Sequence, residues 1–112
     1  MVEKRPWGGY RVLLREPGLQ VKRIHLEPGR RFSLQRHRRR IERWIIMTGT
    51  GIVTIGARRR RVRPGSFVEV PRLAAHRLHN TGKRDLVLVE VQFGDYLKED
   101  DVIRLEDDYG RV

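Results

Sequence analysis

Residues 29–49 read GRRFSLQRHRRRIERWIIMTG, a stretch that begins and ends with glycine. It holds three good metal donors, Gln35, His37 and Glu42. Gln35 and His37 are two residues apart, so on a strand both side chains leave the same face. Glu42 follows a basic turn and precedes an apolar strand, and a hairpin between the two strands would return its carboxylate towards the other donors. We expect a fourth donor from elsewhere in the chain, and His76 is the candidate.

Short strands with turn residues at their joints account for most of the chain. The strands expected from period-two alternation or from apolar runs cover 11–14, 21–26, 32–37, 44–47, 52–55, 58–63, 66–70 and 86–93. Glycine and proline mark the turns between them, as at Pro17-Gly18 and Pro64-Gly65. The chain has no long helical pattern, and we expect coil with a helical turn in the polar tail 96–112. This pattern predicts an all-β barrel or sandwich.

Length and composition narrow the class of protein. A chain of 112 residues predicts one domain, 1–112, whose small core and exposed β edges favour a homodimer. The absence of cysteine excludes a disulfide framework and a zinc–thiolate site. Residues 1–10 lack the apolar run of a signal peptide, and no apolar stretch approaches the roughly 20 residues that span a bilayer. We therefore expect a cytoplasmic protein without a membrane partner.

The charge is unevenly distributed along the chain. The formal net charge is +11, mostly from arginine, whereas residues 95–112 are acidic. The basic residues before position 95 could bind polyanions or phosphorylated ligands, or they could simply form a solvated arginine surface. We favour the solvated surface for most of these arginines. No aromatic residue interrupts the run Arg58–Arg61, as a stacking platform for nucleic acid would require, so we expect no nucleic-acid partner.

Two motifs carry a resemblance to the cupin superfamily. The first consists of Gly29, Gln35, His37, Glu42 and Gly49, and the second of Gly65, Pro71, His76 and Asn80, with Leu73 where a glycine is usual. The chain also resembles the type II mannose-6-phosphate isomerase domain over nearly its whole length. The matching segments are RPWG (5–8), QRH (35–37), RIERW (40–44), HRL (76–78), EVQ (90–92), GDYLKEDD (94–101) and RLEDDYGR (104–111).

The resemblance implies a fold, a metal and a reaction. The fold is a jelly-roll barrel, also called a double-stranded β-helix. The metal is a divalent ion held by Gln35, His37, Glu42 and His76, for which oxygen and nitrogen donors leave zinc, manganese, cobalt, nickel and iron open. The reaction interconverts mannose 6-phosphate and fructose 6-phosphate through an enediolate. In that family the domain usually follows a transferase that makes GDP-mannose, and no glycine-rich nucleotide loop precedes Trp7.

Isomerisation also needs a base and a site for the phosphate. The base must reach the protons on C1 and C2, and Glu90, His79 and Glu69 are candidates. Glu90 lies inside the apolar run 86–93, which favours either a perturbed carboxylate or a buried salt bridge. Arginine binds phosphate through two donors. Arg40 matches the arginine that stands two residues before the glutamate in the family pattern, so the resemblance makes it the first candidate for this catalytic and substrate-binding role, followed by Lys22 and Arg104.

The chain departs from the family pattern at positions 38, 39 and 43, where arginine replaces histidine. Arginine at position 43 removes an expected proton-transfer group beside the metal, because arginine is not a base at neutral pH. An alternative function is therefore a non-catalytic metal cupin that binds a phosphorylated sugar or partners a separate nucleotidyltransferase. A third class is a cupin dioxygenase, since the same donors can hold iron.

Overall fold

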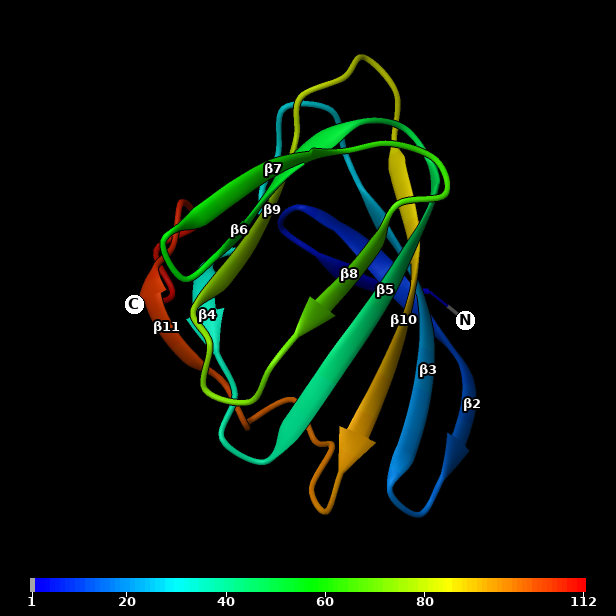
Figure 1. Cartoon of the computed structure of the whole chain (residues 1–112), viewed down its shortest axis with the longest axis vertical. Coiled ribbons are helices and arrows are strands. Elements are labelled where there is room, and N and C mark those ends of the chain that lie inside the picture. The colour runs from blue at the N-terminus through cyan, green and yellow to red at the C-terminus, as the bar shows by residue number, and fades with distance from the viewer. Residues whose placement is uncertain (1) are drawn as a thin grey trace.

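The computed structural model describes residues 2–112, which form two antiparallel sheets that face each other (Figure 1). The first sheet, sheet A, contains in spatial order β1 (Glu3–Arg5), β2 (Gly8–Glu16), β3 (Leu19–Leu26), β10 (Leu86–Gly94), β5 (Arg40–Thr48) and β8 (Phe67–Val70). The second, sheet B, contains β11 (Ile103–Glu106), β4 (Leu34–Arg36), β9 (His76–Asn80), β6 (Gly51–Ile55) and β7 (Arg58–Val62). Residues 2–112 contain no helix long and apolar enough to span a membrane.

Alternation along β5 and β10 divides the interior into an apolar part and a polar part. In both strands every second side chain is buried between the sheets. Towards one end these side chains are apolar, as in Ile46 and Leu88, and they belong to the core. Towards the other end they are polar, as in Glu42 and Glu90. Because β5 pairs with β10 and sets Trp44 opposite Glu90, the polar side chains gather in one region.

The all-β prediction is confirmed, and the expected strands are present with small shifts at their ends. Strands β1, β9 and β11 were not expected. In β9 only Leu78 is apolar, so the alternation that marks a strand is hidden by histidine, arginine and asparagine. Strand β11 lies in the polar tail where we expected coil and a helical turn, and it pairs with β4. Its four residues alternate apolar and polar side chains, but the polar composition of the surrounding tail led us to expect coil.

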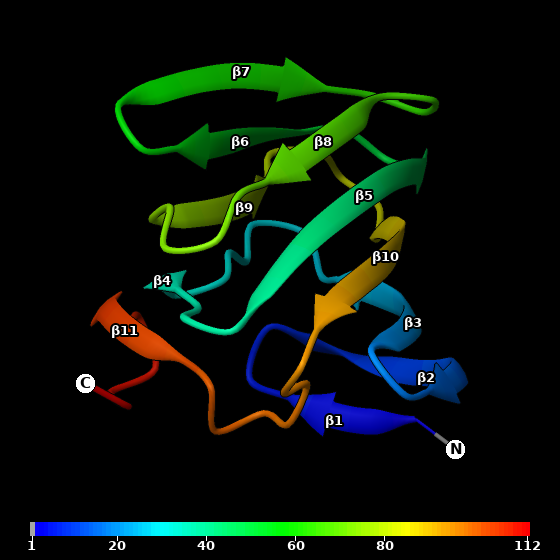
Figure 2. The same cartoon turned by 60° about the horizontal axis from the view of Figure 1, so that its bottom comes forward.

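The predicted hairpin between the Gln35–His37 segment and β5 is wrong. Strand β4 pairs with β9 and β11 in sheet B, whereas β5 pairs with β10 and β8 in sheet A. The connection at residues 37–39 therefore crosses from one sheet to the other (Figure 2). The donors still converge, because the inner faces of the two sheets oppose each other. The expected homodimer stays a prediction, which sedimentation at micromolar concentration would check.

Candidate metal centre

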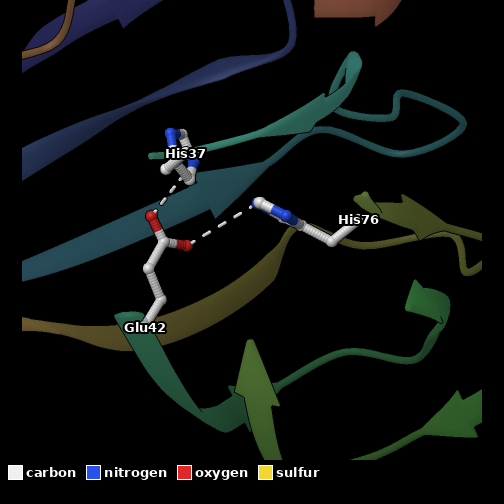
Figure 3. Close-up of side chains that lie close together, drawn as sticks. All are labelled: His37, Glu42 and His76. Atoms are coloured by element: carbon white, nitrogen blue, oxygen red, sulfur yellow. Dashed lines mark ion pairs between the residues drawn. The ribbon is translucent and has the colours of Figure 1, made fainter. Parts of the chain in front are cut away.

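Three of the four predicted donors converge between the sheets (Figure 3). His37 follows β4, Glu42 lies on β5 and His76 begins β9. One ligand atom from each residue lies within 4.8 Å of the others. The Nε2 atom of His37 is 3.3 Å from Oε2 of Glu42, and Nε2 of His76 is 3.8 Å from Oε1. All three side chains are buried, so a bound ion would be shielded from solvent.

Both histidines present the nitrogen that a metal needs. Nδ1 of His76 lies 2.9 Å from the carbonyl oxygen of Ala74, and Nδ1 of His37 lies 2.5 Å from that of Asp101. A carbonyl oxygen can only accept, so each Nδ1 carries the proton and each Nε2 keeps its lone pair. Nε2 of His76 is buried and has no hydrogen-bond partner among residues 2–112. An unsatisfied buried nitrogen aimed at a carboxylate is the arrangement that a metal would complete.

The electrostatics of the donors also suit a cation. Burial lowers the pKa of His37, an effect that Glu42 opposes and Arg40 reinforces, so this imidazole is neutral at neutral pH. Burial alone would raise the pKa of Glu42, but Arg40, His76 and His37 outweigh it and hold that pKa well below its usual range. The centre thus offers one carboxylate, the neutral imidazole of His37 and the unpartnered Nε2 of His76, which fits a divalent ion such as zinc or manganese.

Gln35, the fourth predicted donor, lies opposite His76 in the register between β4 and β9. It lines the same cavity as His37 and Glu42. Its Oε1 accepts a hydrogen bond from the Ser33 hydroxyl at 3.2 Å. The prediction that Gln35 and His37 leave the same face of the strand agrees with this placement, since both line the cavity.

A cavity of about 140 Å³ opens beside the donors. Its walls carry five basic residues, which are Arg5, Lys22, Arg40, Arg104 and Arg111. Nη1 of Arg40 and Nε of Arg104 are buried and have no partner among residues 2–112. Burial and the nearby Arg111 lower the pKa of Arg104. These cations therefore favour an anionic group inside the cavity.

Two of the three guanidinium nitrogens of Arg40 are hydrogen-bonded to the predicted metal donors. Its Nε donates to Oε2 of Glu42 at 2.8 Å, and its Nη2 lies 3.2 Å from Nε2 of His37. Only Nη1 is left for another ligand. Lys22 forms an ion pair with Glu99. Of the three residues predicted to bind substrate, Arg104 therefore has the donor most free to meet an anion.

Glu90 is a buried carboxylate that is connected to the predicted metal donor Glu42 by hydrogen bonds through Trp44. The indole nitrogen of Trp44 donates to Glu42 at 3.2 Å and to Glu90 at 3.0 Å, which links the two carboxylates. The amide of Gln92 donates to the other oxygen of Glu90 at 2.6 Å, and the amide of Gln20 donates to Gln92. Burial and the charge of Glu42 raise the pKa of Glu90 to about 8. Such a group can gain and lose a proton near neutral pH.

The other two candidate bases lie outside this cavity. His79 lines a separate groove on the outer surface of sheet B, beside Arg59 and Arg77, because His76 and Leu78 take the inner positions of β9. Glu69 is exposed on β8, on the opposite side of the strand from the buried Val68 and Val70. Neither residue can reach a molecule bound beside Glu42.

Arg43 is also outside the cavity, which corrects an inference from the sequence. It is exposed on β5, and its guanidinium lies 5.8 Å from the centre of the Phe93 ring. Arg38 and Arg39 are exposed as well. Arginine at positions 38, 39 and 43 therefore does not alter the set of side chains that surround the predicted metal donors. We expected Arg43 beside the metal, but the alternation that points Glu42 inwards points residue 43 outwards.

Sequence reasoning missed several residues that line the cavity or hold its donors. They include Glu99, Asp101 and Arg111, all from the acidic tail. Glu99 and Asp101 are placed by contacts with residues more than sixty positions away in the chain, Lys22 and His37, whereas Arg111 pairs with the nearby Asp107. The polar composition of the tail predicted coil and gave no sign of these contacts.

Two facing antiparallel sheets with histidine and carboxylate donors between them define a cupin. Solved cupin structures agree in fold. The capsular polysaccharide assembling protein CapF from Staphylococcus aureus aligns with a TM-score of 0.81 at 17% identity, over 96% of this chain and 32% of that one. A putative sugar phosphate isomerase from Acidithiobacillus ferrooxidans aligns with a TM-score of 0.66 at 25% identity, over 79% of this chain and 61% of that one.

The chain belongs to the family described as mannose-6-phosphate isomerase C-terminal, whose model matches residues 2–107. The xanthan biosynthesis protein XanB of Xanthomonas campestris pv. campestris is 46% identical over 96% of this chain. A mannose-1-phosphate guanylyltransferase of Klebsiella pneumoniae is 42% identical over 96% of this chain. The chain spans 23% of the length of each of these two relatives.

Proposed function

We propose that this domain is a metal-dependent isomerase that interconverts mannose 6-phosphate and fructose 6-phosphate. One observation carries the proposal: His37, Glu42 and His76 lie together in the interior, and His37 and Glu42 line a cavity that also holds arginine nitrogens without a partner among residues 2–112. Family membership supports the choice of substrate, because the matching model describes a mannose-6-phosphate isomerase domain. A divalent metal held by these residues and Gln35 would supply Lewis-acid stabilisation of negative charge that develops on the sugar oxygens.

Other residues of the cavity bind the phosphate, transfer the proton and position the proton-transfer group. Arg104 binds the phosphate, assisted by Arg111, because a dianion relieves the mutual repulsion of these two half-buried cations. Glu90 moves the proton between C2 and C1, since its raised pKa lets it exchange a proton near neutral pH. Trp44 fixes Glu90 relative to Glu42 through its bifurcated hydrogen bond. The enediolate would thus form in the cavity beside the donors.

Turnover should appear when the stripped protein is reloaded with one of the five metals named above. The measurement is conversion of mannose 6-phosphate to fructose 6-phosphate by the purified protein after chelator treatment and separate reloading. Absence of turnover with every metal, in folded protein that holds the ion, would contradict the isomerase proposal. The chain would then be a metal cupin that binds a phosphorylated sugar. Oxygen consumption during the assay would point instead to a dioxygenase.

Replacing Arg104 by glutamine should raise KM for mannose 6-phosphate about 10- to 100-fold, the value of a hydrogen bond to a charged group. The change in kcat should be smaller, because phosphate binding stabilises substrate and transition state alike. Steady-state kinetics check both values. Arg58→Gln removes the same charge from the exposed strand β7 and serves as the control. Equal KM values for the two variants would show that Arg104 does not bind the phosphate.

A further inference from the structure

The orientation of His37 depends on a residue from the acidic tail. Asp101 accepts the Nδ1 proton of His37 on its backbone oxygen, 64 positions along the chain. His76, by contrast, is oriented by Ala74, two residues away on the same segment. One candidate ligand is thus fixed locally, whereas the other is fixed by a distant segment whose position must itself be maintained.

The carboxylate of Asp101 holds that position. Its Oδ1 accepts the backbone N–H of Arg38 at 3.1 Å, and its Oδ2 accepts that of Arg39 at 3.0 Å. Together with the bond to the imidazole, Asp101 contacts three successive residues of the connection between β4 and β5. A carboxylate that accepts two backbone N–H groups forms strong, charge-assisted bonds. The side chain therefore sets the distance between its own carbonyl oxygen and the His37 ring.

Neighbouring contacts anchor the same tail segment to the cavity. The guanidinium of Arg39 donates to both carboxylate oxygens of Asp95 and lies 4.6 Å from the centre of the Tyr96 ring. Glu99 pairs with Lys22 inside the cavity wall. After Asp101 the chain enters β11, which lies beside β4 (Figure 2). The segment between β10 and β11 thus touches the β4–β5 connection as well as the cavity.

We propose that Asp101 is a positioning residue of the metal centre, and that the acidic segment 95–101 is part of that centre rather than a charge-balancing tail. This inference rests on the proposed metal-dependent function. Asp101 keeps His37 in the tautomer with a free Nε2 and holds the ring at Glu42. An outer-shell group of this kind changes metal affinity by about 10- to 100-fold when it is removed.

The test compares Asp101→Ala with Asp100→Ala. The two substitutions remove the same charge from adjacent residues, but the carboxylate of Asp100 accepts a hydrogen bond only from the exposed Tyr96 hydroxyl. Nitrogen NMR of the imidazoles in metal-free protein reports the tautomer of His37. Titration with Co²⁺, followed by absorbance, reports metal affinity. Urea denaturation confirms that each variant is folded, and Asp101→Asn, which keeps one acceptor oxygen, provides a milder variant.

We expect the parent and Asp100→Ala to show the Nδ1-protonated tautomer and equal Co²⁺ affinities. Asp101→Ala should shift His37 towards the Nε2-protonated form and bind Co²⁺ about 10-fold more weakly or worse, and Asp101→Asn should fall between them. An unchanged His37 tautomer in Asp101→Ala would overturn the inference. Failure of the parent to bind any divalent ion would count against the proposed function instead, while the tautomer measurement in metal-free protein would still decide the role of Asp101.

Discussion

Replacing Glu42 by glutamine should abolish divalent-metal binding, and with it the proposed turnover. Glu42 is the only carboxylate in the donor set, and both imidazoles point their Nε2 atoms at its two oxygens. Glutamine keeps the shape of the side chain but removes the charge, so the cation loses the one ligand that offsets its own charge. Equilibrium titration with zinc or manganese and the isomerase assay measure the two losses.

The same substitution should also weaken the metal-free fold. Glu42 is 2% exposed and accepts hydrogen bonds from Arg40 and Trp44. Removal of one partner from a buried ion pair costs about 3–5 kcal/mol, because the other charge stays buried. Urea denaturation in the presence of a chelator measures this cost. Added metal should then stabilise the parent by mass action but not the variant.

Glu69→Gln is the matched control for Glu42→Gln. Glu69 lies on β8, which pairs with β5, but it is exposed on the outer surface. We expect it to leave both metal affinity and unfolding free energy close to those of the parent. If Glu42→Gln bound metal as tightly as Glu69→Gln, Glu42 would be only a partner of Arg40, and the metal centre would need other ligands.

The sequence predicted which side chains converge between the sheets better than it predicted the path of the chain that brings them together. Spacing of two residues was enough to place Gln35 and His37 on the inner side of the chain, and the second motif identified His76. The predicted hairpin was wrong because short-range pattern does not say which sheet a strand joins. Strand β4 has only three residues, and its partners β9 and β11 come from much later in the chain.

Contacts made by the tail could not be predicted in the same way. A strand or helix gives a periodic pattern, whereas Asp101 is placed by bonds to His37, Arg38 and Arg39 that depend on the finished fold. Arg43 is the opposite case. The inward position of Glu42 and the alternation of a strand were sufficient to place Arg43 outside. The sequence therefore contained enough information to avoid the wrong prediction that residue 43 lies beside the metal.

The metal-free protein should lose stability as the pH rises from about 7 to about 8, and the slope of Glu90→Gln should be less negative than that of the parent from about pH 5 to about 8, where His37, whose pKa is lowered, adds an opposite slope below about pH 7. Burial and the charge of Glu42 raise the pKa of Glu90 to about 8 in the folded protein, against about 4.3 in an unfolded chain. Between these values the unfolded state has released the proton and the folded state keeps it. The unfolded state therefore binds fewer protons, and the free energy of unfolding falls by up to about 1.4 kcal/mol per pH unit.

Urea denaturation across this pH range, with a chelator present, measures the slope for the parent and for Glu90→Gln. Glu99→Gln is the control, because it changes another carboxylate of the same cavity whose pKa is shifted the other way. Burial would raise the pKa of Glu99, but Lys22 outweighs it and lowers that pKa. Glu99 is therefore ionised in both states above about pH 5, and its loss should leave the slope unchanged. Parallel slopes for the parent and Glu90→Gln would show that Glu90 is ionised in the folded protein.

Metal binding provides an independent test of whether Glu90 carries a proton in the metal-free protein. A cation beside Glu42 favours the ionised form of Glu90, so loading should release a proton near neutral pH. Calorimetry in two buffers with different ionisation enthalpies counts the protons released. The parent should release more than Glu90→Gln, and equal counts would mean that the proton on Glu90 is not coupled to the metal centre. A carboxylate that gives up its proton when the metal arrives would be ionised, and able to act as a base, only in the loaded cavity.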